Sequence, residues 1–250
     1  LTTPSFFAYM RIADGCNNRC AYCAIPLIRG DLRSREMDAL VREAEGLAAQ
    51  GVRELVLVAQ DTTMYGQDLA GRSLLPELLE RLCAVDGLRW IRLLYCYPEH
   101  ITDELLSVMR RQPKVLRYLD VPLQHCSGRV LRAMNRPGDR ESLTALFGRI
   151  REALPGVVLR TTILVGFPGE TEADFEELIL KYSDSEEGTC SFGKGEKDQT
   201  FEDAAFNLET DEISDIVETP EGYYLIKCIS TFNRTETDAN KVKIVEKRRE

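Results

Sequence analysis

Histidine, tryptophan and long apolar runs are scarce in this sequence. Its two histidines, at positions 100 and 125, do not stand at a zinc-finger spacing from the three cysteines within residues 16–23. No apolar run reaches membrane-spanning length, and no basic start leads into an apolar stretch, so we expect a cytoplasmic protein without a membrane partner. The net charge of −9 leaves no positive excess for coating a nucleic acid, and no direct nucleic-acid partner is expected.

Lysine is also scarce, and its distribution divides the sequence in two. Lys114 is the only lysine before position 181, against 21 arginines, whereas residues 181–250 hold seven lysines and three arginines. Arginine and lysine differ in geometry and hydration, but no requirement of a fold forces such a switch. We interpret it as two joined segments of different ancestry, and we predict one domain over residues 1–178 and another over residues 179–250.

Five apolar runs in the first segment predict β-strands. They are nearly continuous, as in parallel strands that are buried on both faces, and they cover residues 6–13, 54–59, 90–95, 118–121 and 157–165. Helical patterns lie between them: one ends at Gly51, another follows a predicted N-cap at Asp139, and a fifth helix starts at Thr171. The predicted fold class is therefore α/β, with a parallel sheet that is open or curled into a barrel and has its chemistry at the carboxyl ends of the strands.

The second segment has a different pattern. A short helix is predicted near residues 201–208, and an antiparallel hairpin over residues 213–219 and 223–229 turns at Pro220-Glu-Gly222. Residues 235–250 are predicted to form a polar helix or tail. We expect a small α+β appendage.

Three of the eight cysteines lie within eight residues, in Cys16-Asn-Asn-Arg-Cys20-Ala-Tyr-Cys23 directly after the first predicted strand. The other five are scattered, which does not fit a disulfide framework. Structural zinc requires four closed ligands. Most iron–sulfur clusters are held by four cysteines, so three thiolates without a fourth indicate a 4Fe–4S cluster with one open iron.

The residues around these cysteines resemble a known family. Three cysteines at this spacing, with an aromatic residue before the third, are typical of radical S-adenosylmethionine (SAM) enzymes when they follow the first strand of a parallel barrel. The stretch from Asp14 to Gly30 resembles the cluster loop of the methylthiotransferases. Four further stretches resemble the RimO type, which modifies an aspartate of a small-subunit ribosomal protein: Val58-Ala-Gln-Asp-Thr-Thr63, Leu93-Leu-Tyr-Cys-Tyr-Pro-Glu-His-Ile101, Tyr118-Leu-Asp-Val-Pro-Leu-Gln-His125 and Val165-Gly-Phe-Pro-Gly-Glu-Thr171.

This resemblance implies a fold, an α/β incomplete TIM-like radical SAM barrel with the small α+β appendage, and a site. Cys16, Cys20 and Cys23 would be the catalytic cluster ligands, and SAM would bind the open iron. An electron donor such as flavodoxin or ferredoxin would drive cleavage of the SAM sulfur–carbon bond, and a small-subunit ribosomal protein would be the substrate. Cofactor contacts are implied for residues of the loop and of the strand ends, with ordinary strand-end solvation as the alternative for the two glutamines and the arginine: Tyr22, Gln60, Gln124, Arg160, Gly166 and Phe167.

Other residues fit structural roles. His100 and His125 fit hydrogen-bonded structural histidines near strand ends. Trp90, Met109 and Met134 fit core positions and need no functional role.

Two domains of the resembled family have no counterpart in the sequence: an N-terminal domain with three further cysteines, and a C-terminal β-barrel that holds the substrate. We therefore expect methylthio transfer by this chain alone to be impaired. The alternative within the same chemistry is a tRNA methylthiotransferase, but those enzymes resemble this sequence less because they carry Asn where Asp61 stands.

Residues 179–232 resemble the C-terminal half of a parvulin-type prolyl isomerase. The likeness rests on stretches such as Phe192-Gly-Lys-Gly195, Phe201-Glu-Asp-Ala-Ala-Phe206 and Gly222-Tyr-Tyr-Leu-Ile-Lys227. Tyr224 stands where that family has a histidine, and Lys197 stands near the position of its pocket methionine. We interpret the chain as a chimera. A prolyl-isomerase or peptide-binding tail and an inactive chimera remain alternative hypotheses.

Overall fold

The computed structural model describes residues 3–171, 173–174, 190–220 and 222–232. The chain divides into two compact units, Leu1–Lys181 and Tyr182–Glu250. In the described part of the chain, no helix is both long enough and apolar enough to span a membrane.

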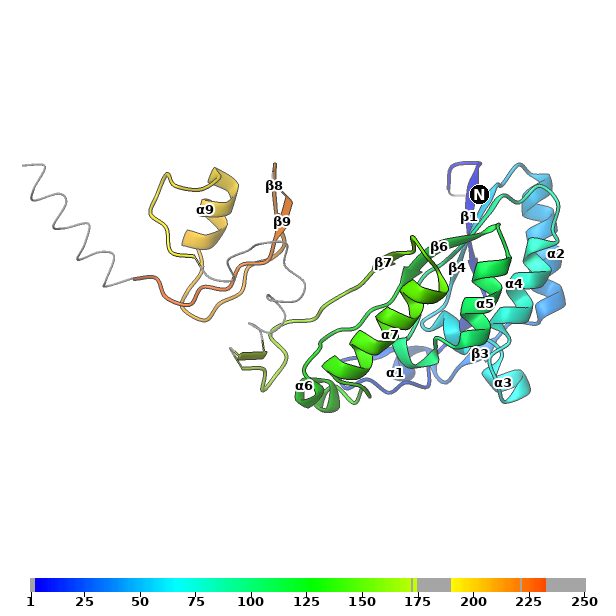
Figure 1. Ribbon diagram of the computed structural model, residues 1–250, viewed down its shortest axis with the longest axis horizontal. Helices are drawn as coiled ribbons and strands as arrows, with labels where there is room; N and C mark the ends of the chain where they lie inside the picture. The colour runs from blue at the N-terminus through cyan, green and yellow to red at the C-terminus, as the bar shows by residue number, and fades with distance from the viewer. Residues whose placement is uncertain (1–2, 172, 175–189, 221, 233–250) are drawn as a thin grey trace, which may run out of the picture. The chain divides into compact units, whose positions relative to one another are not determined.

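The first unit is built on a five-stranded parallel sheet with the order β1-β4-β5-β6-β7 (Figure 1). All five predicted strands are confirmed, with ends that differ from the predicted ones by up to five residues. The strands are β1 (Phe7–Arg11), β4 (Glu54–Val58), β5 (Trp90–Leu93), β6 (Val115–Asp120) and β7 (Val158–Arg160).

Helices follow the strands along the chain and cover one side of the sheet (Figure 1). The predicted N-cap at Asp139 is confirmed, because its carboxylate accepts a hydrogen bond from Ser142 N at 2.9 Å and the Ser142 hydroxyl accepts one from Asp139 N. The four principal helices are α2 (Met37–Ala49), α4 (Leu75–Cys83), α5 (Asp103–Arg111) and α7 (Arg140–Ala153).

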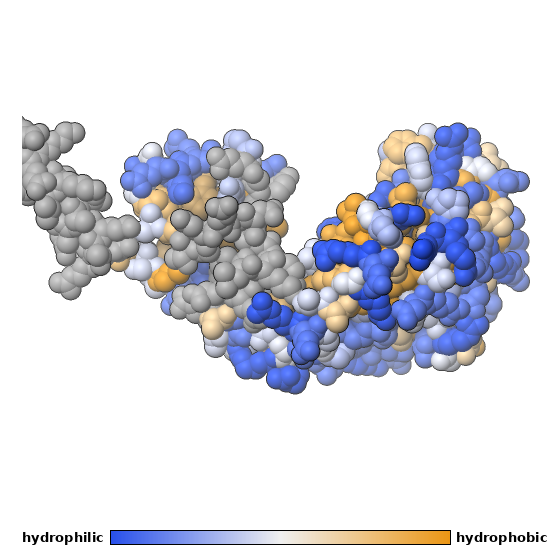
Figure 2. Space-filling model, viewed as in Figure 1, coloured by the Kyte–Doolittle hydropathy of each residue, from blue (hydrophilic) through white to orange (hydrophobic). Residues whose placement is uncertain are grey.

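The two faces of the sheet differ in burial. Met10 and Leu57 face the helices and are fully buried, whereas Tyr9, Trp90 and Val158 are 57%, 46% and 58% exposed. The expectation that both faces are covered is therefore wrong for the described chain, because the helices lie on one face only. Figure 2 shows apolar surface gathered in the first unit and bordered by hydrophilic side chains.

The core predictions divide accordingly. Met109 and Met134 are buried, as predicted. The prediction for Trp90 is wrong, because this residue begins β5 and its side chain is substantially exposed.

Short elements connect the strands and helices. The predicted strand over residues 6–13 is divided into β1 and a separate strand, β2, which pairs antiparallel with β3. These elements are β2 (Ala13–Asp14), α1 (Ile25–Arg29), β3 (Arg33–Ser34), the 3-10 helices η1 (Thr62–Met64) and η2 (Pro98–His100), α3 (Gln67–Ala70) and α6 (Gly128–Ala133).

The predicted fifth helix is described only at its start. Thr171 N donates to Asp174 Oδ2 at 2.9 Å, and Asp174 N donates to Thr171 Oγ1 at 3.4 Å, which is the reciprocal pattern of a helix N-terminus. The rest of this helix and the predicted tail over residues 235–250 lie outside the described residues.

The second unit confirms the predicted helix and hairpin. Helix α9 (Gln199–Phe206) precedes the antiparallel strands β8 (Val217–Thr219) and β9 (Gly222–Tyr224). The Phe192 ring centroid lies 5.5 Å from those of Phe201 and Phe206, and the Phe201 centroid lies 5.1 Å from that of Tyr224. These rings pack against one another, which is a structural role for the aromatic residues of the tail.

Candidate functional site

The three clustered cysteines lie on a loop that β2 and β3 close at its base. Cys16 N donates to Gly30 O at 3.1 Å, so the two ends of the loop are joined. Gly15 has φ +71°, and a Cβ at this position would lie 2.1 Å from Asp31 O. Only glycine fits, because it tolerates a positive φ and leaves room for the opposing backbone.

A buried carboxylate fixes this loop to the sheet edge. Asp61, which follows β4 and is 2% exposed, accepts a hydrogen bond from Asn18 Nδ2 at 2.8 Å. It also accepts one from Thr63 N at 3.0 Å, and its Oδ2 lies 2.9 Å from His100 Nδ1. The cluster loop, the end of β4 and the segment after β5 are thus joined through Asp61.

The segment between α6 and α7 holds the loop from another side. Ala21 N donates to Met134 O at 2.9 Å, and Asn135 Nδ2 donates to Arg19 O at 2.8 Å. Both bonds reach main-chain atoms on either side of Cys20. The loop therefore has a fixed path although its own helix, α1, has no buried residue.

All three cysteine side chains are partly exposed. Cys16 Sγ accepts from Asn18 N at 3.5 Å, and Cys20 Sγ lies 3.8 Å from Arg136 Nη1 and 4.0 Å from the Tyr97 hydroxyl. Burial raises the pKa of the Cys16 thiol, a rise that the Asn18 N–H opposes and the nearby acidic groups increase. Bound iron would keep such a thiol deprotonated.

The donor set fits a cluster better than a single ion. Among the residues that the structure describes, no three His, Cys, Asp or Glu side chains are placed to hold one metal ion. A cubane binds its thiolates on separate iron atoms, so its ligands need not converge as closely as those of one ion. Three partly exposed thiols on one fixed loop satisfy this requirement.

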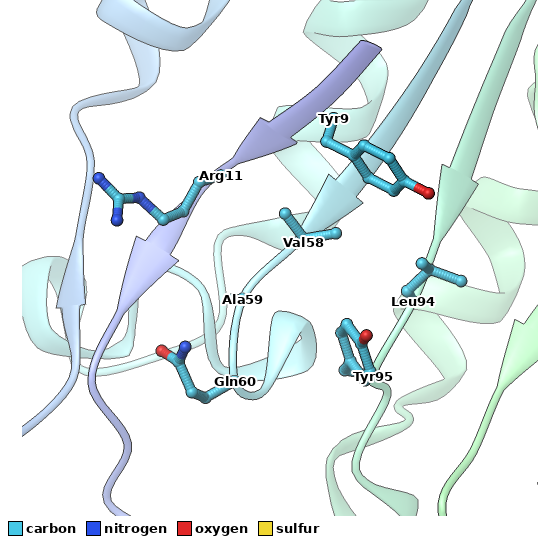
Figure 3. A pocket seen from close by; sticks show the side chains of 7 residues that line it. All are labelled: Tyr9, Arg11, Val58, Ala59, Gln60, Leu94 and Tyr95. Atoms are coloured by element: carbon cyan, nitrogen blue, oxygen red, sulfur yellow. The ribbon is translucent and has the colours of Figure 1, made fainter. Parts of the chain in front are cut away.

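A hollow of about 370 Å³ lies beside the ends of β1, β4 and β5 (Figure 3). Its lining includes Tyr9, Arg11, Gln60 and Tyr95. Gln60 Oε1 is buried and has no hydrogen-bond partner among the described residues. Because an unsatisfied buried acceptor costs about 1–3 kcal/mol, this atom is suited to a ligand that carries a donor, such as the ammonium group of SAM.

Gln124 and Arg160 lie near the ends of the next two strands. Gln124 has φ +69° and forms a parallel bridge to Ile163, so its backbone position is fixed. Arg160 Nη1 donates to Asp120 Oδ1 at 2.8 Å, and Asp120 is fully buried. The structure therefore directs Arg160 toward Asp120 rather than toward the cysteines.

Gly166 and Phe167 form a turn beyond β7. Gly166 has φ +74°, and Phe167 N donates to Glu170 Oε2 at 3.0 Å. Fully buried His125 lies behind this turn: its Nδ1 accepts from Ser127 N, and its Nε2 is 3.5 Å from Glu170 Oε1.

The surroundings of Cys20 include one predicted residue and several that the sequence does not indicate. The predicted residue is Tyr22, which lies beside Cys20 and whose hydroxyl is 3.5 Å from Arg136 Nη1. Arg136 and Tyr97 were not predicted, and the role of Asp61 as an anchor was not either. No local sequence pattern indicates that Arg136 belongs to the site, because it is 116 positions from Cys20.

These features define a class of protein. A parallel sheet carries a fixed loop of three cysteines and, at a neighbouring strand end, a hollow with an unsatisfied polar atom. This is the arrangement of an α/β enzyme core whose chemistry belongs to a bound cofactor.

The family follows from sequence comparison. The model described as the Radical SAM superfamily matches residues 10–181, and the chain belongs to this superfamily. Radical SAM enzymes use a 4Fe–4S cluster and SAM, and the cysteine loop and the Gln60 hollow fit these groups. A second model, for the PPIC-type PPIASE domain, matches residues 169–230, in agreement with the parvulin-like tail.

Curated relatives are similar to the first unit. The ribosomal protein uS12 methylthiotransferase RimO of Pelotomaculum thermopropionicum is 55% identical over 179 residues, which are 72% of this chain and 40% of the relative. The protein of the same name from Desulforudis audaxviator is 59% identical over 174 residues, or 70% and 39%. The one from Clostridium botulinum strain Loch Maree is 49% identical over 204 residues, or 76% and 46%. The chain thus spans less than half the length of these relatives.

A solved structure shares the fold. The radical SAM methyltransferase TsrM from Kitasatospora setae, with cobalamin and a [4Fe-4S] cluster bound, aligns with a TM-score of 0.56 and 21% identity. The alignment covers 70% of this chain and 34% of that one. At this identity the likeness concerns the fold alone.

Proposed function

We propose that residues 1–178 form the radical SAM core of a methylthiotransferase that acts on an aspartate of a small-subunit ribosomal protein. The observation that carries the chemistry is the loop of Cys16, Cys20 and Cys23, closed by β2 and β3 beside the strand ends. Support for the substrate is the 55–59% identity to two proteins named as uS12 methylthiotransferases. Residues 179–250 would form a separate parvulin-like domain.

The proposed roles follow from the donor groups. Cys16, Cys20 and Cys23 would hold three irons of the cluster and leave the fourth open. When bound, the cluster and SAM supply a one-electron cleavage of the SAM sulfur–carbon bond. The chain itself would orient SAM: Gln60 offers an unsatisfied acceptor, and the Gly166 turn offers backbone to the adenine.

The remaining assigned residues would act around these groups. Gln124 and Arg160 would provide polar contacts, with the orientation of Arg160 set by Asp120. Tyr22 would shield the cluster beside Cys20. The reaction would take place in the cytoplasm, with an electron from a donor of the flavodoxin or ferredoxin class.

The test uses the whole chain after anaerobic reconstitution with iron and sulfide. It is given SAM, reductant and a peptide that contains the candidate aspartate of uS12. We expect 5′-deoxyadenosine by liquid chromatography. Because methylthio transfer by this chain alone is expected to be impaired, we expect little methylthio product on the peptide by mass spectrometry. Cys20→Ala should abolish SAM cleavage, whereas Cys83→Ala, a half-buried cysteine outside the loop, should retain it.

Two outcomes separate the parts of this proposal. SAM cleavage that depends on Cys20, with modification of a tRNA anticodon stem-loop and not of the peptide, would refute the substrate and keep the chemistry. No SAM cleavage in a folded chain that holds iron would refute the chemistry.

The PPIC-type match to residues 169–230 supports a second candidate, a peptide-binding or prolyl-isomerising tail. Tyr224, where the resembled family has a histidine, packs edge-on against Phe201. A proline-isomerisation assay on the intact chain tests this candidate, and catalysis that Tyr224→Phe abolishes would support it.

A further inference from the structure

Arg136 is a buried cation beside the cysteine loop. It lies between α6 and α7 and is 6% exposed. Its backbone N donates to Leu131 O at 2.8 Å, which holds the residue at the end of α6. A guanidinium in such a place loses most of its hydration and requires other partners.

The guanidinium is held in one orientation. Arg136 Nη2 donates to Pro122 O at 2.9 Å, and its central carbon lies 4.0 Å from the centroid of the Tyr97 ring. That ring in turn stacks on His100, with centroids 5.1 Å apart. The remaining terminal nitrogen, Nη1, points to Tyr22 and Cys20.

No carboxylate neutralises this charge in an ion pair within the described part of the chain. The charge of Arg136 acts electrostatically on Glu99, but the two side chains form no ion pair. A buried ion without a counter-ion is strongly unfavourable, so the structure calls for an anion at this position. Cys20 Sγ, 3.8 Å from Nη1, is the atom that becomes anionic when it ligates iron.

The three cysteines therefore have unequal surroundings. Cys20 Sγ faces the guanidinium of Arg136 and the hydroxyl of Tyr97, whereas Cys16 Sγ accepts from one backbone N–H. Hydrogen bonds to the sulfurs and nearby charge are among the factors that set the reduction potential of an iron–sulfur cluster. A positive charge favours the state that holds the additional electron.

We propose that Arg136 sets the reduction potential of the cluster, because its buried charge at Cys20 stabilises the reduced form. The inference rests on the proposed cluster ligation by Cys16, Cys20 and Cys23. It makes Arg136 a positioning and tuning residue that acts through Cys20. Loss of the charge would make the cluster harder to reduce.

The test is a potentiometric titration of the reconstituted whole chain, with the reduced cluster followed by electron paramagnetic resonance. Arg136→Gln should shift the ratio of reduced to oxidised cluster at a given potential at least tenfold toward the oxidised form, which is about 59 mV for a one-electron couple. Arg136→Lys keeps the charge and should shift it less than about threefold, or half as many millivolts. Arg132→Gln removes the same charge at an exposed position of α6 and should leave the ratio unchanged.

Tyr97→Phe separates charge from hydrogen bonding, since it removes the hydroxyl near Cys20 and keeps the ring under Arg136. Its shift should be smaller than that of Arg136→Gln. Equal potentials for the parent and Arg136→Gln, with about four irons in each, would overturn the inference and leave the ligand assignment intact.

The iron content of the parent and of the two Arg136 variants distinguishes the remaining outcomes. Loss of the cluster in Arg136→Gln with retention in Arg136→Lys would support the requirement for charge. Loss in both variants would overturn the tuning role in favour of a structural one. A folded parent without iron would refute the proposed function and this inference together.

Discussion

Gly15→Ala is the sharpest test of the loop geometry. An L-residue at φ +71° costs about 1–2 kcal/mol, and the added Cβ would lie 2.1 Å from Asp31 O and 2.7 Å from Gly30 O. The contact with Gly30 O would also break the hydrogen bond from Cys16 N to Gly30 O, and the loss of this bond costs about 1 kcal/mol more. Closing the loop should therefore become about 2–3 kcal/mol less favourable, which lowers cluster affinity about 30- to 150-fold.

Two further glycines supply matched controls. Gly30 has φ +75° and ψ −162° but no atom within 4 Å of its added Cβ, so Gly30→Ala reports backbone strain alone, about 1–3 kcal/mol, and should lose about 5- to 150-fold in cluster affinity. Gly46 lies inside α2 with no atom within 4 Å of its added Cβ, and Gly46→Ala should raise the free energy of unfolding by about 0.5–1 kcal/mol without changing affinity.

The assay is the iron that each reconstituted variant retains against a competing chelator, with urea unfolding as a check on the fold. Retention by Gly15→Ala equal to that of Gly46→Ala would refute the geometry given for the loop base.

Three further predictions concern stability. Asp61→Asn weakens the contacts of a buried acceptor to Asn18 and His100, so it should lower the free energy of unfolding in urea by about 1–3 kcal/mol. The control Asp38→Asn, at an exposed position, should change this free energy by less than about 0.5 kcal/mol. Equal effects of the two substitutions would contradict the anchoring role of Asp61. Burial opposes ionisation of Asp174, but hydrogen bonds from Thr171, Ser127 and Arg129 outweigh it and hold its pKa well below the usual value of about 3.9. Its carboxylate therefore stabilises the fold above about pH 4 and less as the pH falls further, and Asp174→Asn should flatten this acid dependence in unfolding measured against pH; an unchanged slope would count against it. Burial raises the pKa of Tyr65 to about 12, so the free energy of unfolding should fall as the pH rises from about 10 toward that value. Tyr65→Phe should remove this alkaline loss, and it should cost about 1 kcal/mol at neutral pH because the hydrogen bond to Arg35 O is lost. An alkaline loss that persists in Tyr65→Phe would contradict the assignment.

Strand identity could be predicted because apolar runs reflect burial directly. The run 54–59 became β4 with nearly the same bounds, and the cysteine spacing could be recognised because its ligands are local. The run 157–165 gave only Val158–Arg160, since its later residues meet the sheet through a single bridge at Ile163. Periodicity cannot report such a partial contact.

The rest of the site depends on tertiary structure. Trp90 is apolar but lies on the sheet face that the described helices leave open, and its sequence neighbourhood does not distinguish the two faces. Arg136 reaches Cys20 from 116 positions away, and Asp61 reaches Asn18 from 43 positions away. Long-range hydrogen bonds of single polar residues leave no periodic pattern in the sequence, so only the folded chain shows them.

The central claim is that the loop of Cys16, Cys20 and Cys23 binds one cluster with an open iron, and the measurement that tests it most directly is iron and acid-labile sulfide per chain after anaerobic reconstitution. We predict about four of each in the parent and in Cys83→Ala, with loss of both in Cys20→Ala. Little iron in a folded parent, or the same iron content in Cys20→Ala as in the parent, would contradict the account.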